Sequence, residues 1–264
     1  MKYLRKFETE SDYNSYRNGS NFITPNVSHI VELEHLPAGD PRKSVMFSPY
    51  VEPPFKMVDL GLPSGLLWAD RNVGASSPED AGLYFQWGDT IGYTKDQIGV
   101  DKVFNWANYW DSINGSNSNF NKYALDKLTI LQPEDDAARV NMGSDWRIPT
   151  KTELQELIDN TTPTFIDLQG NEFSQSEVQS GVITKGNLKG VRFTGSNGNS
   201  IFISASGSCY ASTLSGTNSA CYLLSSDLYP SSSSYIWGFF FDCNGYPGVS
   251  SYDLYNGRHV RAVK

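Results

Sequence analysis

The sequence predicts an α+β domain over residues 55–264, preceded by a small N-terminal module over residues 1–54. Two observations predict the larger domain. Two helix starts lie in its first half, and after Asn160 the helical pattern gives way to short apolar segments separated by Gly- and Asn-rich turns. A few helices followed by many short strands are typical of the α+β class. A chain of 264 residues is long enough to bury the core of such a domain.

The first 54 residues are interrupted by proline and carry little apolar surface. A short polar helix is expected to begin near Thr9 and to end at Asn18-Gly19. The prolines that interrupt the rest of this segment are Pro37, Pro41, Pro49, Pro53 and Pro54. Because so little apolar surface cannot build a robust core, we expect the module to dock on another protein or to trimerise.

Three short strands are expected before residue 90. They cover residues 57–60, 66–69 and 84–88. The next segment, 91–129, is rich in Asn and aromatic residues and is too long to be an incidental connection. We expect Trp106, Tyr109 and Trp110 to anchor this segment to the domain.

Two helices follow, each with a recognisable start. The first is expected over residues 132–140, with Pro133 in the first turn and acidic residues next to the positive end of the helix dipole. The second begins with a capping box formed by Thr150 and Glu153, and its apolar face carries Leu154 and Leu157.

The second half of the chain contains the remaining strand patterns. They cover residues 182–183, 191–193, 201–203, 222–225, 235–242 and 259–263. The tryptophans of the first half, Trp68, Trp87 and Trp146, are expected to pack in the core.

Residues 204–264 have the composition of a binding surface. Serine and glycine supply adaptable hydrogen bonds and tight turns, and aromatic rings supply wide contact area at little entropic cost. In residues 235–241 both faces of the expected strand are apolar, so one face is expected to fill the core and the other to be either covered or exposed for binding. The predicted ligand-binding residues are Tyr210, Asp227, Tyr229, Tyr235, Trp237, Phe239, Tyr246, Tyr252, Asp253 and Tyr255.

Charge and hydropathy argue against several classes of partner. A formal net charge of −8 without a cluster of basic residues disfavours nucleic-acid binding. The apolar runs are far shorter than the roughly 20 residues of a membrane span, so no membrane insertion is expected. The first residues, MKYLRKFETESD, lack the apolar stretch of a secretory signal, and we expect none.

The sequence offers no pattern for catalysis, for a cofactor or for a metal. The three histidines are scattered and have no metal-ligand spacing with the cysteines. A calcium site at Gln132-Pro133-Glu134-Asp135 is disfavoured, because this segment opens a helix and has no matching Trp-Asn-Asp element downstream. No serine lies in a nucleophile elbow. We therefore expect a protein that is not an enzyme.

Three cysteines lie in the last third, at positions 209, 221 and 243. An odd number in turn-rich sequence is not a disulfide framework, and free thiols at tolerant surface positions are the favoured interpretation. A bridge between Cys209 and Cys221 stays open, provided that their strands are neighbours.

Four ordered motifs carry a resemblance to a known family. They are VDLGLPSGLLWADRNVGASSPEDAGLYFQWGDT, DDAARVNMGSDWRIPTKTELQELIDN, GNSIFISASG and NGRHVRAV. Together they cover residues 56–264 and resemble the Fibrobacter succinogenes major paralogous domain, which is similar to C-type lectins of the formylglycine-generating-enzyme type. The resemblance implies a C-type-lectin-like fold in which residues 57–60 pair with residues 259–263. Cys209, Cys221 and Cys243 do not match the catalytic motif of the oxidases in that fold class.

The family resemblance extends to the variable proteins of diversity-generating retroelements in Bacteroides phages. In those proteins template adenines are mutated, so asparagine codons yield residues such as Tyr, Ser, Asp, Gly and Cys, which dominate residues 209–255 here. The chain departs from the family at Leu224, where an aromatic Trp commonly precedes the Ser-Ser pair. The segments YLRKFETESDYNSY and ITPNVS resemble leaders of phage structural proteins.

These observations predict a phage virion receptor-binding or fibre-tip protein. Its C-terminal face is expected to bind a host cell-surface glycan or protein, and its N-terminal module to contact other virion proteins. A homotrimer is expected, because several weak sites gain affinity by acting together; a monomer by light scattering would contradict it. Two alternatives stay open: a bacterial surface adhesin or carbohydrate-binding module, and a structural virion decoration protein without ligand.

Overall fold

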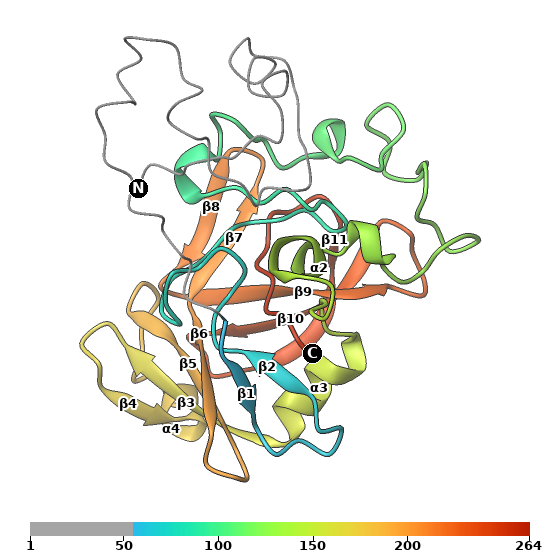
Figure 1. The fold of residues 1–264 in the computed structure, drawn as a ribbon. Helices are drawn as coiled ribbons and strands as arrows, with labels where there is room; N and C mark the ends of the chain where they lie inside the picture. Colours follow the sequence, from blue (N-terminus) through green and yellow to red (C-terminus); the bar gives the residue numbers. More distant parts are fainter. Residues whose placement is uncertain (1–54) are drawn as a thin grey trace, which may run out of the picture. The chain divides into compact units, whose positions relative to one another are not determined.

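The computed structural model describes residues 55–264, and the predictions made for residues 1–54 lie outside the described residues. The described part is a mixed α+β domain built mostly of strands, with three short α-helices (Figure 1). The helices are α2 (Ala137–Met142), α3 (Lys151–Asp159) and α4 (Gln175–Gln179). None of the described helices has the length and apolarity of a bilayer span.

Two sheets and a hairpin form the frame of the domain. The hairpin pairs β1 (Met57–Asp59) with β2 (Leu67–Ala69). The four-stranded sheet is antiparallel, in the order β4 (Glu172–Ser174), β3 (Thr161–Asp167), β5 (Leu188–Gly195), β6 (Ser200–Ser204). The five-stranded sheet has the order β11 (Gly248–Asp253), β10 (Tyr235–Asp242), β9 (Ala220–Leu228), β7 (Ser206–Tyr210), β8 (Thr213–Thr217). In it only β7 and β9 run parallel.

The C-terminal segment, residues 257–264, joins these parts. Val263 pairs with both Trp68 of β2 and Arg147, and Leu223 of β9 pairs with His259. The expected pairing of residues 57–60 with residues 259–263 is therefore wrong. The strand that bonds to the C-terminal segment is β2, and β1 pairs with the opposite edge of β2.

The helix starts follow the capping signals. Thr150 and Glu153 form the predicted capping box of α3, whose Leu154 and Leu157 are buried. The helix expected over residues 132–140 is broken, because Asp136 accepts hydrogen bonds from the next helical N–H groups and so starts α2 afresh after a 3₁₀ turn at Pro133–Asp135. α4, which was not among the predicted helices, also begins with a capping box, formed by Ser174 and Glu177.

Three of the expected strands are absent from the structure, and two of them, at residues 84–88 and 259–263, form only isolated bridges. Residues 182–183 form no strand, although Ile183 is buried; its apolar character serves packing after α4. Trp68, Trp87 and Trp146 are core residues, as predicted. Phe239 and Phe241 of β10 meet Phe193 of β5 across the main core, with the Phe193 and Phe239 ring centroids 5.6 Å apart.

His259 is a buried base inside this frame. Its ring lies 4.2 Å from the Tyr84 ring, its Nδ1 lies 3.2 Å from the carbonyl oxygen of Leu83, and its Nε2 has no hydrogen-bond partner among the described residues. Burial lowers the pKa of His259 to about 4, although the Leu83 carbonyl acts in the opposite direction. The folded chain therefore keeps this imidazole neutral.

This burial predicts a loss of stability on mild acidification. Between pH ~6.5 and pH ~4 the unfolded chain binds a proton at His259, whereas the folded chain keeps this imidazole neutral. The free energy of unfolding should therefore fall by up to ~3 kcal/mol as the pH drops from ~6.5 to ~4. Urea unfolding at a series of pH values measures this slope. The matched control is His259→Gln, which should show a shallower slope in that window; identical slopes would contradict the prediction.

Candidate functional site

Seven of the ten predicted ligand-binding residues lie on β7, β9, β10 and β11, and Tyr229, Tyr246 and Tyr255 lie in the segments that follow these strands. Most of the ten fall into two clusters. The first, which we call the Trp237 cluster, comprises Lys151, Asp227, Tyr229 and Trp237. The Tyr229 ring packs edge-on against Trp237, with centroids 4.8 Å apart. The Lys151 ammonium lies 4.8 Å from the centroid of the Trp237 ring, a cation–π contact. The half-exposed Trp237 indole thus contacts both the turn after β9, through Tyr229, and the first residue of α3, Lys151.

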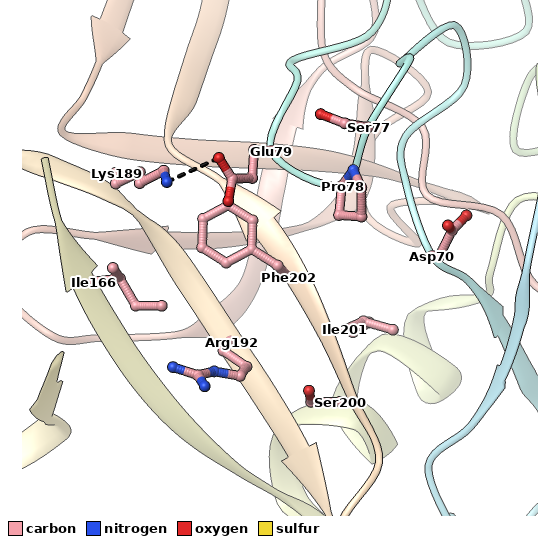
Figure 2. Close-up of a pocket in the computed structure, with 10 residues that line it drawn as sticks. All are labelled: Asp70, Ser77, Pro78, Glu79, Ile166, Lys189, Arg192, Ser200, Ile201 and Phe202. Carbon is pink, nitrogen blue, oxygen red and sulfur yellow. Dashed lines mark ion pairs between the residues drawn. The ribbon is translucent and has the colours of Figure 1, made fainter. Parts of the chain in front are cut away.

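Of two clefts in the domain, only the smaller one contains a predicted ligand-binding residue, Asp227. A cleft of about 590 Å³ over β5 and β6 contains none of the predicted ligand-binding residues (Figure 2). A smaller cleft of about 370 Å³ is lined by Leu125, Thr129, Ile130, Asp227, Leu228 and Pro230. Both volumes fall within the roughly 300–1,000 Å³ typical of ligand sites. The smaller cleft therefore adjoins the Trp237 cluster through Asp227.

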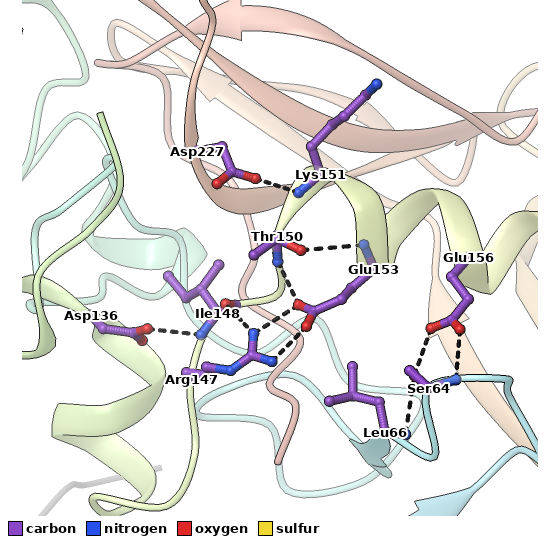
Figure 3. A network of polar contacts seen from close by, with 10 residues as sticks. All are labelled: Ser64, Leu66, Asp136, Arg147, Ile148, Thr150, Lys151, Glu153, Glu156 and Asp227. Atoms are coloured by element: carbon purple, nitrogen blue, oxygen red, sulfur yellow. Dashed lines mark hydrogen bonds and ion pairs between the residues drawn. The ribbon is translucent and has the colours of Figure 1, made fainter. Parts of the chain in front are cut away.

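The Asp227 carboxylate is tied to the start of α3. It accepts a hydrogen bond of 2.5 Å from the backbone N–H of Lys151 (Figure 3). The same helix start is braced by Glu153, which accepts from Arg147 and from the Thr150 N–H. Burial raises the pKa of Asp227, and the Lys151 N–H acts against that shift. A half-buried acceptor is thus fixed at the first residue of α3, whose ammonium contacts the Trp237 ring.

The wall of the smaller cleft is a segment of the long loop that pairs with the end of β9. The Leu228 N–H donates to the Thr129 carbonyl at 2.8 Å, and Ile130 forms an antiparallel bridge with Asp227. Ile130 and Leu125, which both line this cleft, are 52% and 43% exposed. The cleft thus combines exposed apolar surface with one carboxylate.

The second cluster surrounds a buried arginine and is called the Arg258 cluster. Its members are Tyr210, Tyr222, Tyr252, Asp253, Tyr255 and Arg258. The Arg258 guanidinium lies 4.6 Å from the centroid of the Tyr252 ring, and its Nη1 donates to the Asp253 carbonyl at 2.7 Å. The Tyr252 ring packs against Tyr222 at 5.5 Å, and Tyr255 lies 6.0 Å from Tyr210.

The Arg258 charge lacks a direct counter-ion. No ion pair among residues 55–264 includes Arg258, and its buried Nε has no hydrogen-bond partner there. Burial lowers the pKa of Arg258 to about 10, while Tyr252 and Asp253 act in the opposite direction. Burial also raises the pKa of Tyr255 to about 12. The site therefore holds a cation and neutral phenols at neutral pH.

Two predicted site residues are less accessible than expected. Phe239 is fully buried, because β10 turns this ring toward Phe193 and the core under α3; its assignment to the binding surface is wrong. Tyr255 is only 9% exposed, because it packs on Trp106 of the long loop with centroids 4.7 Å apart. Tyr255 is therefore a buried packing residue of the Arg258 cluster.

The exposed tyrosines do not form one face. Tyr235 and Tyr246 are 39% and 56% exposed, but Tyr235 begins β10 and Tyr246 follows its end. Eight extended residues separate two points by roughly 25 Å. Tyr235 lies opposite Asp253 in the β10–β11 register, beside the two clusters, whereas Tyr246 follows Gly245, whose carbonyl accepts from Gln175 of α4. A single surface containing all ten residues is therefore wrong.

Lys151, Arg258 and Tyr222 are site residues that were not predicted from the sequence. Lys151 follows the predicted cap of α3, and its place next to Trp237 depends on a contact between distant segments. Arg258 lies in the NGRHVRAV motif, and an arginine directly before an expected strand was the available signal. Tyr222 alternates with Leu223 on β9, which places it opposite Phe240.

The described residues show little potential for nucleophilic chemistry. The three cysteines are free; Cys209 and Cys221 are buried rather than at the surface, and burial raises the pKa of each thiol to about 12. Between residues 55 and 264 no group of three or more His, Cys, Asp or Glu side chains is arranged to hold a metal ion.

Comparisons of the chain with protein-family models, with curated proteins and with solved structures return no match.

Proposed function

We propose that this chain is a phage virion receptor-binding or fibre-tip protein. Residues 55–264 act as a C-type-lectin-like domain that binds a host cell-surface glycan or protein, through the Trp237 and Arg258 clusters. The proposal includes the N-terminal module as the attachment to other virion proteins, and a homotrimer in which three weak sites act together.

One observation carries the proposal: half-exposed aromatic rings on and next to the five-stranded sheet are held in ring–ring and cation–π contacts. Trp237 touches Tyr229 and Lys151, and Tyr252 touches Tyr222 and Arg258. Preorganised aromatic rings lose little entropy on binding and dominate the energetics of recognition surfaces. The serine-rich turn between β9 and β10 supplies adaptable hydrogen bonds beside them.

The test is the binding of the labelled full chain to intact Bacteroides cells. Trp237→Ala should lower binding at least tenfold, because a central aromatic anchor contributes about 2 kcal/mol or more to such interfaces. The matched control is Tyr246→Ala, which removes an exposed ring beyond the opposite end of β10 and should bind as the unaltered chain does. Thermal unfolding of each variant verifies that its fold is retained.

Two outcomes would contradict the proposal. Unchanged binding by folded Trp237→Ala and by Arg258→Met would remove both clusters from the binding surface. Absence of binding by the unaltered chain to every strain tested would favour a decoration protein without ligand.

A further inference from the structure

The larger cleft lies on the outer face of the four-stranded sheet, away from the two clusters. Its lining residues are Asp70, Ser77, Pro78, Glu79, Ile166, Lys189, Arg192, Ser200, Ile201 and Phe202 (Figure 2). Strands β3, β5 and β6 form its floor, and the loop around Pro78 forms one wall. At about 590 Å³ the cleft is large enough for a small ligand.

The floor of the cleft carries an aromatic ring over a glycine. In the sheet register Arg192 lies opposite Phe202, and Gly190 lies opposite Ser204 on the next row. A Cβ atom at Gly190 would lie 2.4 Å from Cζ of Phe202, so the ring crosses the space that a side chain would occupy. Phe202 is half-buried. The glycine lets the ring lie close against the strand, with its remaining surface available to the cleft.

The rim of the cleft carries hydrogen-bond donors and acceptors, with as many acidic as basic side chains. Glu79 and Lys189 form an ion pair of 2.8 Å, which places a carboxylate and an ammonium side by side above the ring (Figure 2). Arg192 is paired with Glu172, and Asp70 is held by Arg71 at 2.8 Å. Because two acids and two bases line the cleft, a strongly charged ligand of either sign would meet repulsion as well as attraction.

These features select a class of ligand. A neutral sugar has an apolar C–H face that packs on an aromatic ring, and vicinal hydroxyls at its edge that both donate and accept. The ion pair at the rim presents matching groups for such hydroxyls. An extended peptide fits less well, because the Phe202 carbonyl, which a peptide strand added to β6 would need, already accepts from Arg261 Nη2 at 2.8 Å.

We propose that this cleft is a saccharide-binding site for a neutral hexose or N-acetylhexosamine unit. Phe202 is the stacking platform, and Glu79 and Lys189 are the groups that bind the hydroxyls. The site shares no residue with the Trp237 and Arg258 clusters, so it stands or falls independently of the proposed receptor-binding function.

In the experiment the full chain is titrated with methyl glycosides of glucose, galactose, mannose and N-acetylglucosamine at millimolar concentrations. Saturation-transfer NMR detects the binding of each glycoside. We expect at least one of the four to bind. Phe202→Ala should weaken that binding at least tenfold, and Phe202→Trp should restore it, because the larger ring keeps the platform. The matched control is Phe240→Ala, which removes a half-buried ring from β10 and should leave sugar binding unchanged.

Three results would overturn the proposal. The first is that no glycoside of the panel binds the unaltered chain. The second is that a glycoside binds folded Phe202→Ala as tightly as the unaltered chain, since the ring would then not be the platform. The third is that galacturonic acid binds while all four neutral glycosides fail, since the cleft would then recognise an anion. Glu79→Gln adds a readout that packing alone would not move: it should weaken binding while thermal unfolding stays unchanged, because Glu79 is largely exposed.

Discussion

Arg261→Met is expected to lower the free energy of unfolding by about 3–5 kcal/mol. The Arg261 side chain is completely buried and donates to the Asn72 side chain at 2.9 Å, to the Ala69 carbonyl at 3.2 Å and to the Phe202 carbonyl at 2.8 Å. Methionine fills a similar volume but leaves these acceptors without a donor. Each buried acceptor left unpaired costs about 1–3 kcal/mol.

The measurement is urea unfolding at neutral pH, and the chain offers a matched control three residues away. Arg258 is also buried, but Nη1 makes one backbone hydrogen bond and Nε makes none. Replacing Arg258 by methionine should change the free energy of unfolding by less than about 1 kcal/mol. The contacts that are lost are offset because the folded chain no longer bears the cost of burying a charge. Equal losses in the two variants would show that burial, rather than satisfied donors, sets the contribution of these arginines.

Trp87→Ala is expected to be the other strongly destabilising change, by about 3–5 kcal/mol. The Trp87 indole is completely buried, packs on the Tyr123 ring at 4.9 Å and donates from Nε1 to the Ser225 carbonyl at 2.8 Å. Its backbone carbonyl also accepts from the side chains of Tyr109 and Trp110. Removing the indole opens a cavity under the long loop as well as in the core.

Trp87→Phe separates the two contributions of this residue. It keeps most of the packing and deletes only the bond to Ser225, so its loss should be smaller, near 1–2 kcal/mol by the cost of one unpaired buried carbonyl. Thermal unfolding monitored by circular dichroism compares the three proteins. Stability that is unchanged in Trp87→Ala would contradict the assignment of this indole to the core.

Much of the fold follows from local sequence signals. The strand predicted over residues 235–242 is β10 with both ends as expected, and the capping box at Thr150 starts α3. These elements depend on periodicity and on side chains that bond to their own backbone neighbours. The pairing of β2 with Val263 depends on segments far apart in the chain, and no local pattern indicates which strand of the hairpin the C-terminal segment joins.

The site was predictable by residue type but not by face. Both faces of β10 are apolar, and a register shift between β9 and β10 falls between Ile236 and Gly238, so alternation alone could not separate Trp237 from the buried Phe239. The contacts of Lys151 and Arg258 with aromatic rings could not be predicted from the sequence either. The contact of Lys151 with Trp237 forms only when α3 packs beside β10.

The central position of the C-terminal segment has a consequence for folding. Residues 257–264 bond to β2, β9 and Arg147, and most of them are buried. Each of these pairings joins segments that lie far apart in the sequence. Contacts of such high contact order form slowly, so intermediates that lack them leave apolar surface of the hairpin and of β9 exposed to aggregation.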